Sequence, residues 1–211
     1  MEQTLTRSAS AESTGTERYA DFIGLIGRTF NEQSRPAVME AFETARTALD
    51  GMVRYDGTPL FDHSVRTAEI VISEIGLGRN STISTLLHDA ARLGLLNAEE
   101  IERRFGAIPV SILEGMNLIS KVRTKISMSQ ADNFRDLIVS YSTDPRIILI
   151  KLADRLEVMR SLAMFPEAKQ QKKSWESMNL YAQIAHKLGL YSIKSELEDI
   201  ALKYLEPEEY A

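Results

Sequence analysis

Apolar side chains recur at helical spacing along almost the whole chain from Tyr19 onward, and this pattern constrains the fold more than any other feature. Residues three and four apart share one face of a helix, whereas a half-buried strand would alternate apolar and polar residues. The ranges with the helical pattern are about 22–30, 38–49, 62–75, 81–89, 97–105, 166–188 and 192–205. The sequence therefore predicts a fold built from helices.

One apolar run is ambiguous by composition alone. The residues at 147–150 are all Ile or Leu, and such a short run fits a buried strand or a buried helix. The apolar pattern continues at helical spacing through Leu152 and Met159. Asp144-Pro145 is also a good helix start, because the missing N–H of proline costs nothing in the first turn. We therefore expect a fully buried central helix here and an all-α fold class overall.

Residues 1–17 differ from the rest of the chain. They are rich in Ser, Thr and Glu and carry no apolar period, so they cannot bury enough surface to offset the entropy of ordering. No linker or internal repeat divides the remainder, and a hydrophobic content of 44% is enough for one core. We predict a disordered tail at 1–17 and a single helical domain at 18–211.

Charge and composition narrow the partners. The formal net charge is -5 at pH 7, so the chain has no net positive field to attract a DNA backbone, although a local basic pocket for one small polyphosphate is compatible with it. There are no cysteines, which excludes disulfides and thiolate metal sites. No secretory signal or apolar run of about 18 residues is present. We expect a cytoplasmic protein without a DNA or membrane partner.

Two of the three histidines have company that suits a metal ion. His88-Asp89 lies in an apolar helical run, where an unpaired carboxylate is costly to bury and a metal ion would supply the partner. Imidazole and carboxylate together suit Mn²⁺, Fe²⁺ or Zn²⁺. The alternative is an ordinary pair on a helix surface. His63 begins a predicted helix, and it is either a ligand or a satisfied surface histidine.

Asp154 lies in the most apolar predicted helix, in the segment Lys151-Leu152-Ala153-Asp154-Arg155. A bare aspartate there would be anomalous, so it is either a metal ligand or one end of a salt bridge with Lys151 or Arg155. Both interpretations stay open from the residues alone.

Together these residues follow the order H…HD…D of the HD-superfamily metal-dependent phosphohydrolases, and the surrounding words resemble the hydrolase domain of the RelA/SpoT family. The segment at 54–63 is similar to R-x-S-G-E-P-Y-x-x-H, and the segment at 84–89 to A-x-L-L-H-D. The segment at 144–156 is close to D-x-R-V-I-L-I-K-L-A-D-R-L. The resemblance covers roughly 45–211 and implies a single-domain HD-type helical bundle.

The resemblance implies an enzyme that removes pyrophosphate from the 3′ position of guanosine tetra- and pentaphosphate, usually with Mn²⁺. It also implies that Arg54 binds the guanine nucleotide and that Lys121 and Arg160 face the polyphosphate. His186 is expected to be structural and capped into the core near a helix end. The resemblance also implies four metal ligands, which are His63, His88, Asp89 and Asp154.

Two catalytic features of the family are absent. The family places Glu-Asp two residues after HD to position and deprotonate the attacking water, and this chain has Arg92-Leu93 there. The family's H-N, whose asparagine contacts the nucleotide, is Glu157-Val158 here. Arg92 lies one helical turn after His88, so it is either a phosphate-binding catalytic cation or an ordinary surface arginine. Asp62 or Glu157 is a candidate for a relocated base.

Two functions therefore stay open. One is a metal-dependent phosphohydrolase that acts on a guanosine polyphosphate or a related nucleotide. The other is a catalytically degenerate HD domain that senses a nucleotide or regulates an adjoining or separate synthetase. Larger relatives carry a synthetase module directly after the segment matched by 205–210, so a synthetase module or a second copy of the chain (a homo-oligomer) is the expected protein partner.

Overall fold

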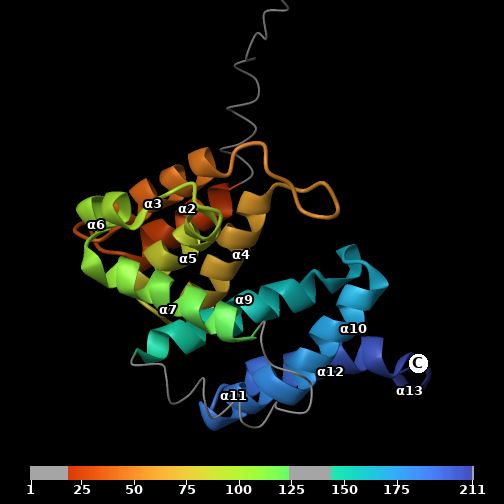
Figure 1. Ribbon diagram of the computed structural model, residues 1–211. Coiled ribbons are helices and arrows are strands. Elements are labelled where there is room, and N and C mark those ends of the chain that lie inside the picture. The colour runs from red at the N-terminus through yellow and green to blue at the C-terminus, as the bar shows by residue number, and fades with distance from the viewer. Residues whose placement is uncertain (1–18, 124–143, 211) are drawn as a thin grey trace, which may run out of the picture.

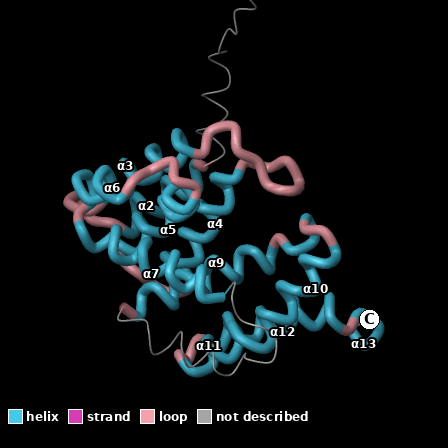
Figure 2. Tube along the Cα trace, viewed as in Figure 1, coloured by secondary structure: helices cyan, strands magenta, loops and turns pink. Residues whose placement is uncertain are grey.

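The computed structural model describes residues 19–123 and 144–210, and within these ranges the chain is helical, without strands (Figures 1 and 2). The only strand-like pairing in the described part is an isolated bridge between Val53 and Pro59. The all-α prediction is confirmed, whereas the predicted tail at 1–17 lies outside the described residues. No described helix is long and apolar enough to cross a membrane.

The helices follow one another in two groups along the chain. The first group is α2 (Ala20–Thr29), α3 (Arg35–Ala48), α4 (Leu60–Ser73), α5 (Arg79–Arg92), α6 (Ala98–Phe105) and α7 (Ala107–Arg123). The second group is α9 (Pro145–Arg160), η2 (Leu162–Met164), α10 (Glu167–Glu176), η3 (Ser177–Tyr181), α11 (Ala182–Lys187), α12 (Tyr191–Leu205) and α13 (Pro207–Tyr210). The helix predicted over 166–188 thus contains a π-helical turn, η3, between α10 and α11.

Helix boundaries lie at residues with cap-forming side chains or with positive φ, as the sequence indicates. The side chain of Asn97 accepts a hydrogen bond from the backbone N–H of Glu100 at 2.8 Å and begins α6. Gly51 and Gly189 have φ of 77° and 75°, the left-handed conformation that glycine adopts most readily, and each follows a helix end. Local signals therefore fix where these helices start and stop.

Buried apolar side chains form two clusters. One joins α2, α3, α5 and α6 and includes Phe22, Phe42 and Leu86, while the other joins α9, α11 and α12 and includes Leu156 and Leu197. Helices α4 and α7 contribute side chains to both clusters. In Figure 1, α9 lies between the first group of helices and the later ones. The boundary between the two clusters therefore runs along α4 and α7, and α9 belongs to the second cluster.

Helix α9 is the central helix that the sequence predicts. Asp144 caps it by accepting a hydrogen bond from the backbone N–H of Arg146 at 3.0 Å. Ile150 and Leu156 are fully buried. At its start, α9 approaches α7 so closely that a Cβ on Gly115 would lie 2.2 Å from Ile147 Cδ1. This close approach sets the position of α9 and of the polar side chains that it carries.

Candidate metal centre

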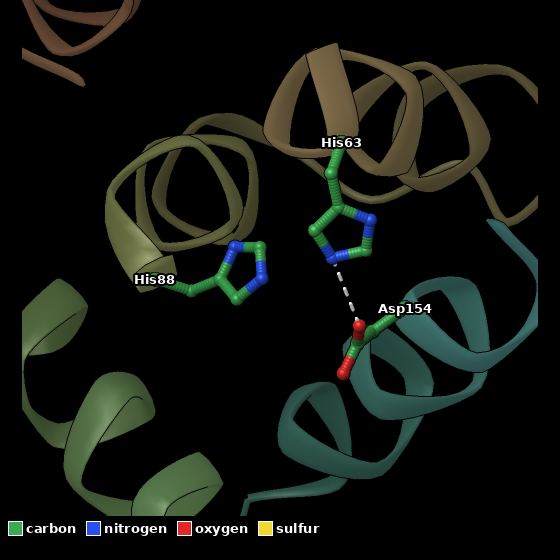
Figure 3. Close-up of side chains that lie close together, drawn as sticks. All are labelled: His63, His88 and Asp154. Carbon is green, nitrogen blue, oxygen red and sulfur yellow. Dashed lines mark ion pairs between the residues drawn. The ribbon is translucent and has the colours of Figure 1, made fainter. Parts of the chain in front are cut away.

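Three helices bring the four predicted metal ligands together. His63 comes from α4, His88 from α5 and Asp154 from α9 (Figure 3), and Asp89 follows His88 on α5. Candidate ligand atoms of His63, His88 and Asp154 all lie within 4.8 Å of one another, and His63 Nε2 is 3.1 Å from Asp154 Oδ1. Asp89 Oδ2 lies 3.5 Å from His88 Nε2 and 3.9 Å from His63 Nε2. Ligands separated by up to 91 positions in the sequence thus converge on one point.

One oxygen of this cluster is buried without a hydrogen bond. Asp89 is 3% exposed, and no donor from the described residues reaches its Oδ2. Burial acts to raise the pKa of Asp89, but the positive charges of His88, His63 and Arg92 lower it below its usual range. An ionised oxygen buried without a donor is costly, and a cation between the imidazoles would stabilise it. Two nitrogen and two carboxylate donors fit a divalent ion such as Mn²⁺, Fe²⁺ or Zn²⁺.

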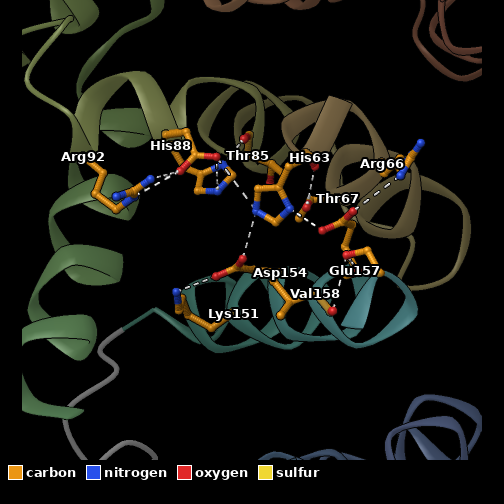
Figure 4. Close-up of polar contacts among 12 residues, drawn as sticks. His63, Arg66, Thr67, Thr85, His88, Arg92, Lys151, Asp154, Glu157 and Val158 are labelled. Carbon is orange, nitrogen blue, oxygen red and sulfur yellow. Dashed lines mark hydrogen bonds and ion pairs between the residues drawn. The ribbon is translucent and has the colours of Figure 1, made fainter. Parts of the chain in front are cut away.

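The hydrogen bonds outside the cluster orient both imidazole rings for coordination. His88 Nδ1 donates to the carbonyl oxygen of Thr85 at 2.6 Å, and His63 Nδ1 lies in close contact with a carboxylate oxygen of Glu157 (Figure 4). These bonds make Nδ1 of each ring a donor, so each Nε2 faces the centre, where a metal ion would replace any proton that it carries. Metal-binding histidines are commonly held in this way.

Each carboxylate of the cluster turns its other oxygen toward a basic side chain. Lys151 Nζ lies 2.6 Å from Asp154 Oδ2, and Arg92 Nη2 lies 2.6 Å from Asp89 Oδ1. Burial acts to raise the pKa of Asp154, but Lys151 and His63 hold it well below its usual range. The salt bridge that the sequence offered as an alternative for Asp154 is therefore present, and it leaves Oδ1 facing the centre.

The pKa of His63 shows that the surrounding carboxylates stabilise a positive charge in the cluster. Burial acts to lower the pKa of His63, but its hydrogen bonds with Asp154 and Glu157 raise the pKa to about 10. In the metal-free protein, a proton shared by these groups compensates their negative charge. A divalent ion coordinated by His63 and Asp154 would compensate the same charge. Donor types, burial and charge all fit a metal centre.

The two predicted catalytic residues have different surroundings. Arg92 is half-exposed, pairs with Asp89 and lines the cavity above the cluster. Asp62 is buried and accepts a hydrogen bond from the hydroxyl of Tyr19 at 2.6 Å. Asp62 does not line that cavity. The structure brings Arg92 to the centre and does not bring Asp62 there.

Arg54, predicted to bind the nucleotide, is held in an interior ion pair. Its Nη1 donates to Glu157 Oε1 at 2.8 Å, and its Nη2 donates to Glu157 Oε2 at 3.1 Å and to Ser161 Oγ at 2.7 Å. The side chains of Arg54 and Glu157 are 6% and 2% exposed. The sequence indicated Glu157 only as a candidate base and gave no sign of this pair, because nothing in it links positions 103 residues apart.

The other basic candidates are not brought to the centre by described contacts. Arg160 pairs with Glu74 and Glu196 at 2.6 Å each and lines a second cavity, apart from the one above the cluster. Lys121 belongs to α7, but its side chain lies outside the described part. His186 is exposed on α11, so the prediction that it is capped into the core is wrong.

A cavity of about 570 Å³ opens over the cluster. Aromatic and basic side chains line its mouth, where the rings of Tyr55 and Phe165 lie 5.3 Å apart. Lys169 lies over the ring of Tyr55 and Lys173 over that of Phe165, at 4.6 and 4.7 Å. The sequence did not single out Phe165 or Lys173, because a helical pattern does not mark which of its side chains face a cavity. The cavity is large enough for a nucleotide-sized ligand.

Comparisons with known proteins agree with this geometry. The HD domain family matches residues 41–191. A guanosine-3′,5′-bis(diphosphate) 3′-pyrophosphohydrolase of Aquifex aeolicus is 40% identical over 178 residues, which are 84% of this chain and 25% of that protein. The bifunctional (p)ppGpp synthase/hydrolase SpoT of Escherichia coli is 32% identical over 187 residues, 88% of this chain and 26% of that protein. The chain thus spans about a quarter of the length of these curated relatives.

A solved structure described as a metazoan ortholog of SpoT that hydrolyses ppGpp has a TM-score of 0.58 and is 18% identical. The match covers 87% of this chain and 99% of that chain, and at this identity it supports the fold alone. The resemblance to the RelA/SpoT proteins is confirmed by the sequence relatives and the family match. The chain belongs to the HD domain family, among the relatives of the RelA/SpoT proteins.

Proposed function

We propose that this domain is a metal-dependent phosphohydrolase that removes pyrophosphate from the 3′ position of guanosine tetra- or pentaphosphate. The observation that carries the proposal is the four-residue cluster, in which Asp89 Oδ2 is buried without a hydrogen bond beside both imidazoles. The names of the relatives support the substrate, since two of them are pyrophosphohydrolases or hydrolases of this nucleotide.

His63, His88, Asp89 and Asp154 would hold the ion, with Mn²⁺ as the metal that the resemblance favours. When bound, a divalent ion polarises a phosphoryl oxygen and lowers the pKa of a coordinated water. The chain adds positive charge around the same place, because Lys151, Arg92 and Lys173 line the cavity. These side chains would stabilise the negative charge of the polyphosphate and of the departing pyrophosphate.

The described residues of this site do not include an evident general base. Of the described residues that line the cavity, Asp89 and Asp154 carry the only carboxylates, and both belong to the metal cluster. Asp62 is bonded to Tyr19, and Glu157 is paired with Arg54 and His63, so the described contacts favour neither as a relocated base. Because a general base contributes about 10²–10⁴-fold, we expect slow hydrolysis compared with relatives that have the Glu-Asp pair.

The nucleoside would bind differently from the way the resemblance implies. Arg54 lines the cavity, but its guanidinium donates to Glu157 and Ser161, which leaves it fewer donors for a base. Tyr55, which is 57% exposed, and Phe165 offer aromatic surface at the mouth of the cavity instead. We propose that the guanine base packs against these rings while Lys169 and Lys173 approach its phosphates.

A second function is favoured by the absence of a spare carboxylate among the described lining residues. In this alternative the domain binds the nucleotide and metal without turnover, and it regulates a synthetase in the same or another chain. One relative, from Myxococcus xanthus, is named GTP pyrophosphokinase and is 34% identical over 82% of this chain and 23% of its own length, which supports a link to synthesis. A second copy of this chain is a further candidate partner.

The test is pyrophosphate release from ppGpp by the purified chain with Mn²⁺, beside the Asp89→Asn variant. Release by the wild type that disappears in the variant supports hydrolysis at this centre. If the wild type binds Mn²⁺ and ppGpp but releases no pyrophosphate, the regulatory alternative stands. Introducing the family pair with Arg92→Glu and Leu93→Asp is expected to raise release by about 10²–10⁴-fold.

A further inference from the structure

Glu157 of α9 is a buried carboxylate between an arginine and a metal-ligand histidine. It is 2% exposed, and it lies three residues after Asp154, so that both side chains point to nearly the same side of the helix. Its two oxygens accept two hydrogen bonds from Arg54. Figure 4 shows the further contact between Oε2 and His63 Nδ1. Burying an ion so completely is costly unless its partners are well placed. Both of its oxygens have partners here.

These contacts determine which nitrogen of His63 carries the proton. The fork of Arg54 pairs with both oxygens of Glu157, as it does with an ionised carboxylate, and an ionised carboxylate only accepts hydrogen bonds. His63 Nδ1 must therefore be the donor. Its Nε2, which is 3.1 Å from Asp154 Oδ1, then faces the centre, where a metal ion would take the place of the proton shared with Asp154.

We propose that Glu157 is a positioning residue of the metal centre, which fixes the orientation and tautomer of His63, and that Arg54 serves Glu157 rather than the nucleotide. The inference rests on the proposed metal site but not on the identity of the nucleotide. It gives one explanation for two departures from the family pattern: a glutamate where the family has histidine, and an arginine whose guanidinium is bonded to that glutamate. The chain thus converts a nucleotide-binding arginine into part of the support of the metal centre.

The chain offers a matched control for the loss of charge. Glu176 forms a second inward-facing pair, with Arg155 Nη2 at 2.7 Å, and the Arg155 side chain is 4% exposed. No contact of Glu176 with a ligand histidine is found among the described residues. A substitution of Glu176, whose side chain is 14% exposed, therefore removes another largely buried Arg–Glu pair without touching His63.

The experiment measures the dissociation constant of Mn²⁺ by isothermal titration calorimetry on the metal-free chain. Glu157→Ala is expected to weaken Mn²⁺ binding by about 10–100-fold, as loss of an outer hydrogen-bond partner typically does. Glu157→Gln keeps the shape and an accepting oxygen, so it should fall between Glu157→Ala and the wild type. The Glu176→Gln control should bind Mn²⁺ as the wild type does.

A second readout separates positioning from mere stability. In the Zn²⁺-loaded protein, ¹⁵N NMR of the imidazole should show His63 protonated at Nδ1 in the wild type, with this signal lost or exchanging in Glu157→Ala. Folding of each variant is checked by circular dichroism, and Glu157→Gln keeps the test open if the alanine variant does not fold.

Wild-type affinity in folded Glu157 variants would overturn the inference, as would an equal loss in Glu176→Gln. These outcomes differ from failure of the proposed function. If Glu157 variants lose Mn²⁺ affinity but the wild type never releases pyrophosphate from ppGpp, the positioning role stands and the hydrolase proposal fails.

Discussion

The two histidines of the centre are held by different kinds of contact. His88 donates to the carbonyl of Thr85, three residues earlier on the same helix, whereas His63 contacts Glu157, 94 residues further along the chain. The α5 side of the centre, His88 and Asp89, is therefore arranged by local helix geometry. The α4–α9 side, His63, Asp154 and Glu157, depends on how two distant helices pack. Substitutions that disturb packing should act on the second side first.

The ion pairs of the two sides differ in how far the arginine is exposed to solvent. On the α5 side the side chain of Arg92 is 50% exposed, and its pair with Asp89 is within reach of solvent and salt. On the α4–α9 side the Arg54–Glu157 pair is almost fully buried. A buried charge left without its partner is far more costly than an exposed one. The two sides should therefore respond very differently to the loss of an arginine.

The largest expected effect is common to both sides. Asp89→Asn on α5 and Asp154→Asn on α9 should each abolish tight Mn²⁺ binding, because each removes an ionised donor from the centre. Metal content after dialysis against Mn²⁺, measured by mass spectrometry, checks this. Asp62→Asn is the control, since Asp62 is buried next to His63 in sequence but is bonded to Tyr19. Unchanged stoichiometry in both ligand variants would refute the site.

The arginine on each side gives the next largest contrast. Arg54→Ala leaves Glu157 buried without its main partner and should destabilise the fold by about 3–5 kcal/mol. Arg92→Ala removes a half-exposed donor from the buried Asp89 Oδ1 and should cost less, about 1–3 kcal/mol. Urea unfolding of both variants measures the two free energies of unfolding. Equal losses would break the distinction between the two sides.

The packing that positions α9 can be tested at Gly115. A methyl group there would collide with Ile147, so Gly115→Ala should destabilise by about 1–3 kcal/mol despite the better helix propensity of alanine. Ile147→Val removes the nearest carbon, Cδ1, and should restore part of the loss in the double variant. Thermal unfolding of the single and double variants decides. A stabilising Gly115→Ala would show that α7 and α9 have room between them.

The smallest expected effect is at the start of α9. Asp144→Ala removes the side chain that caps the backbone N–H of Arg146, and it should cost about 1 kcal/mol of stability. Urea unfolding measures this loss, and Mn²⁺ affinity should hardly change, because the cap lies at the far end of the helix from Glu157. A marked loss of Mn²⁺ affinity would contradict this.

The four ligands and the helical fold could be predicted because their signals are local. Helical spacing identified α9 as buried, and the words around His63, His88 and Asp154 resemble family motifs. The direction of a neighbouring side chain was harder to predict. Asp62 precedes His63 on α4, and since successive residues lie about 100° apart around a helix, it faces Tyr19 instead of the centre.

Arg160 and Glu157 show the same limit on α9. Arg160 follows Asp154 by six residues, which places it about 240° around the helix, so it meets Glu74 and Glu196 away from the cluster. The pairing of Glu157 with Arg54 depends on the packing of the 54–59 loop against α9, which no local pattern encodes. Sequence therefore predicts which residues can bind a metal better than it predicts which residues orient them.

The most direct measurement is an anomalous difference map from crystals grown with Mn²⁺, recorded at the manganese edge. We expect one strong peak at the proposed metal centre, about 2 Å from Nε2 of both histidines, from Asp89 Oδ2 and from Asp154 Oδ1. Such distances are typical of nitrogen and oxygen ligands. A peak elsewhere, or none at this centre in protein that binds Mn²⁺, would contradict the metal centre.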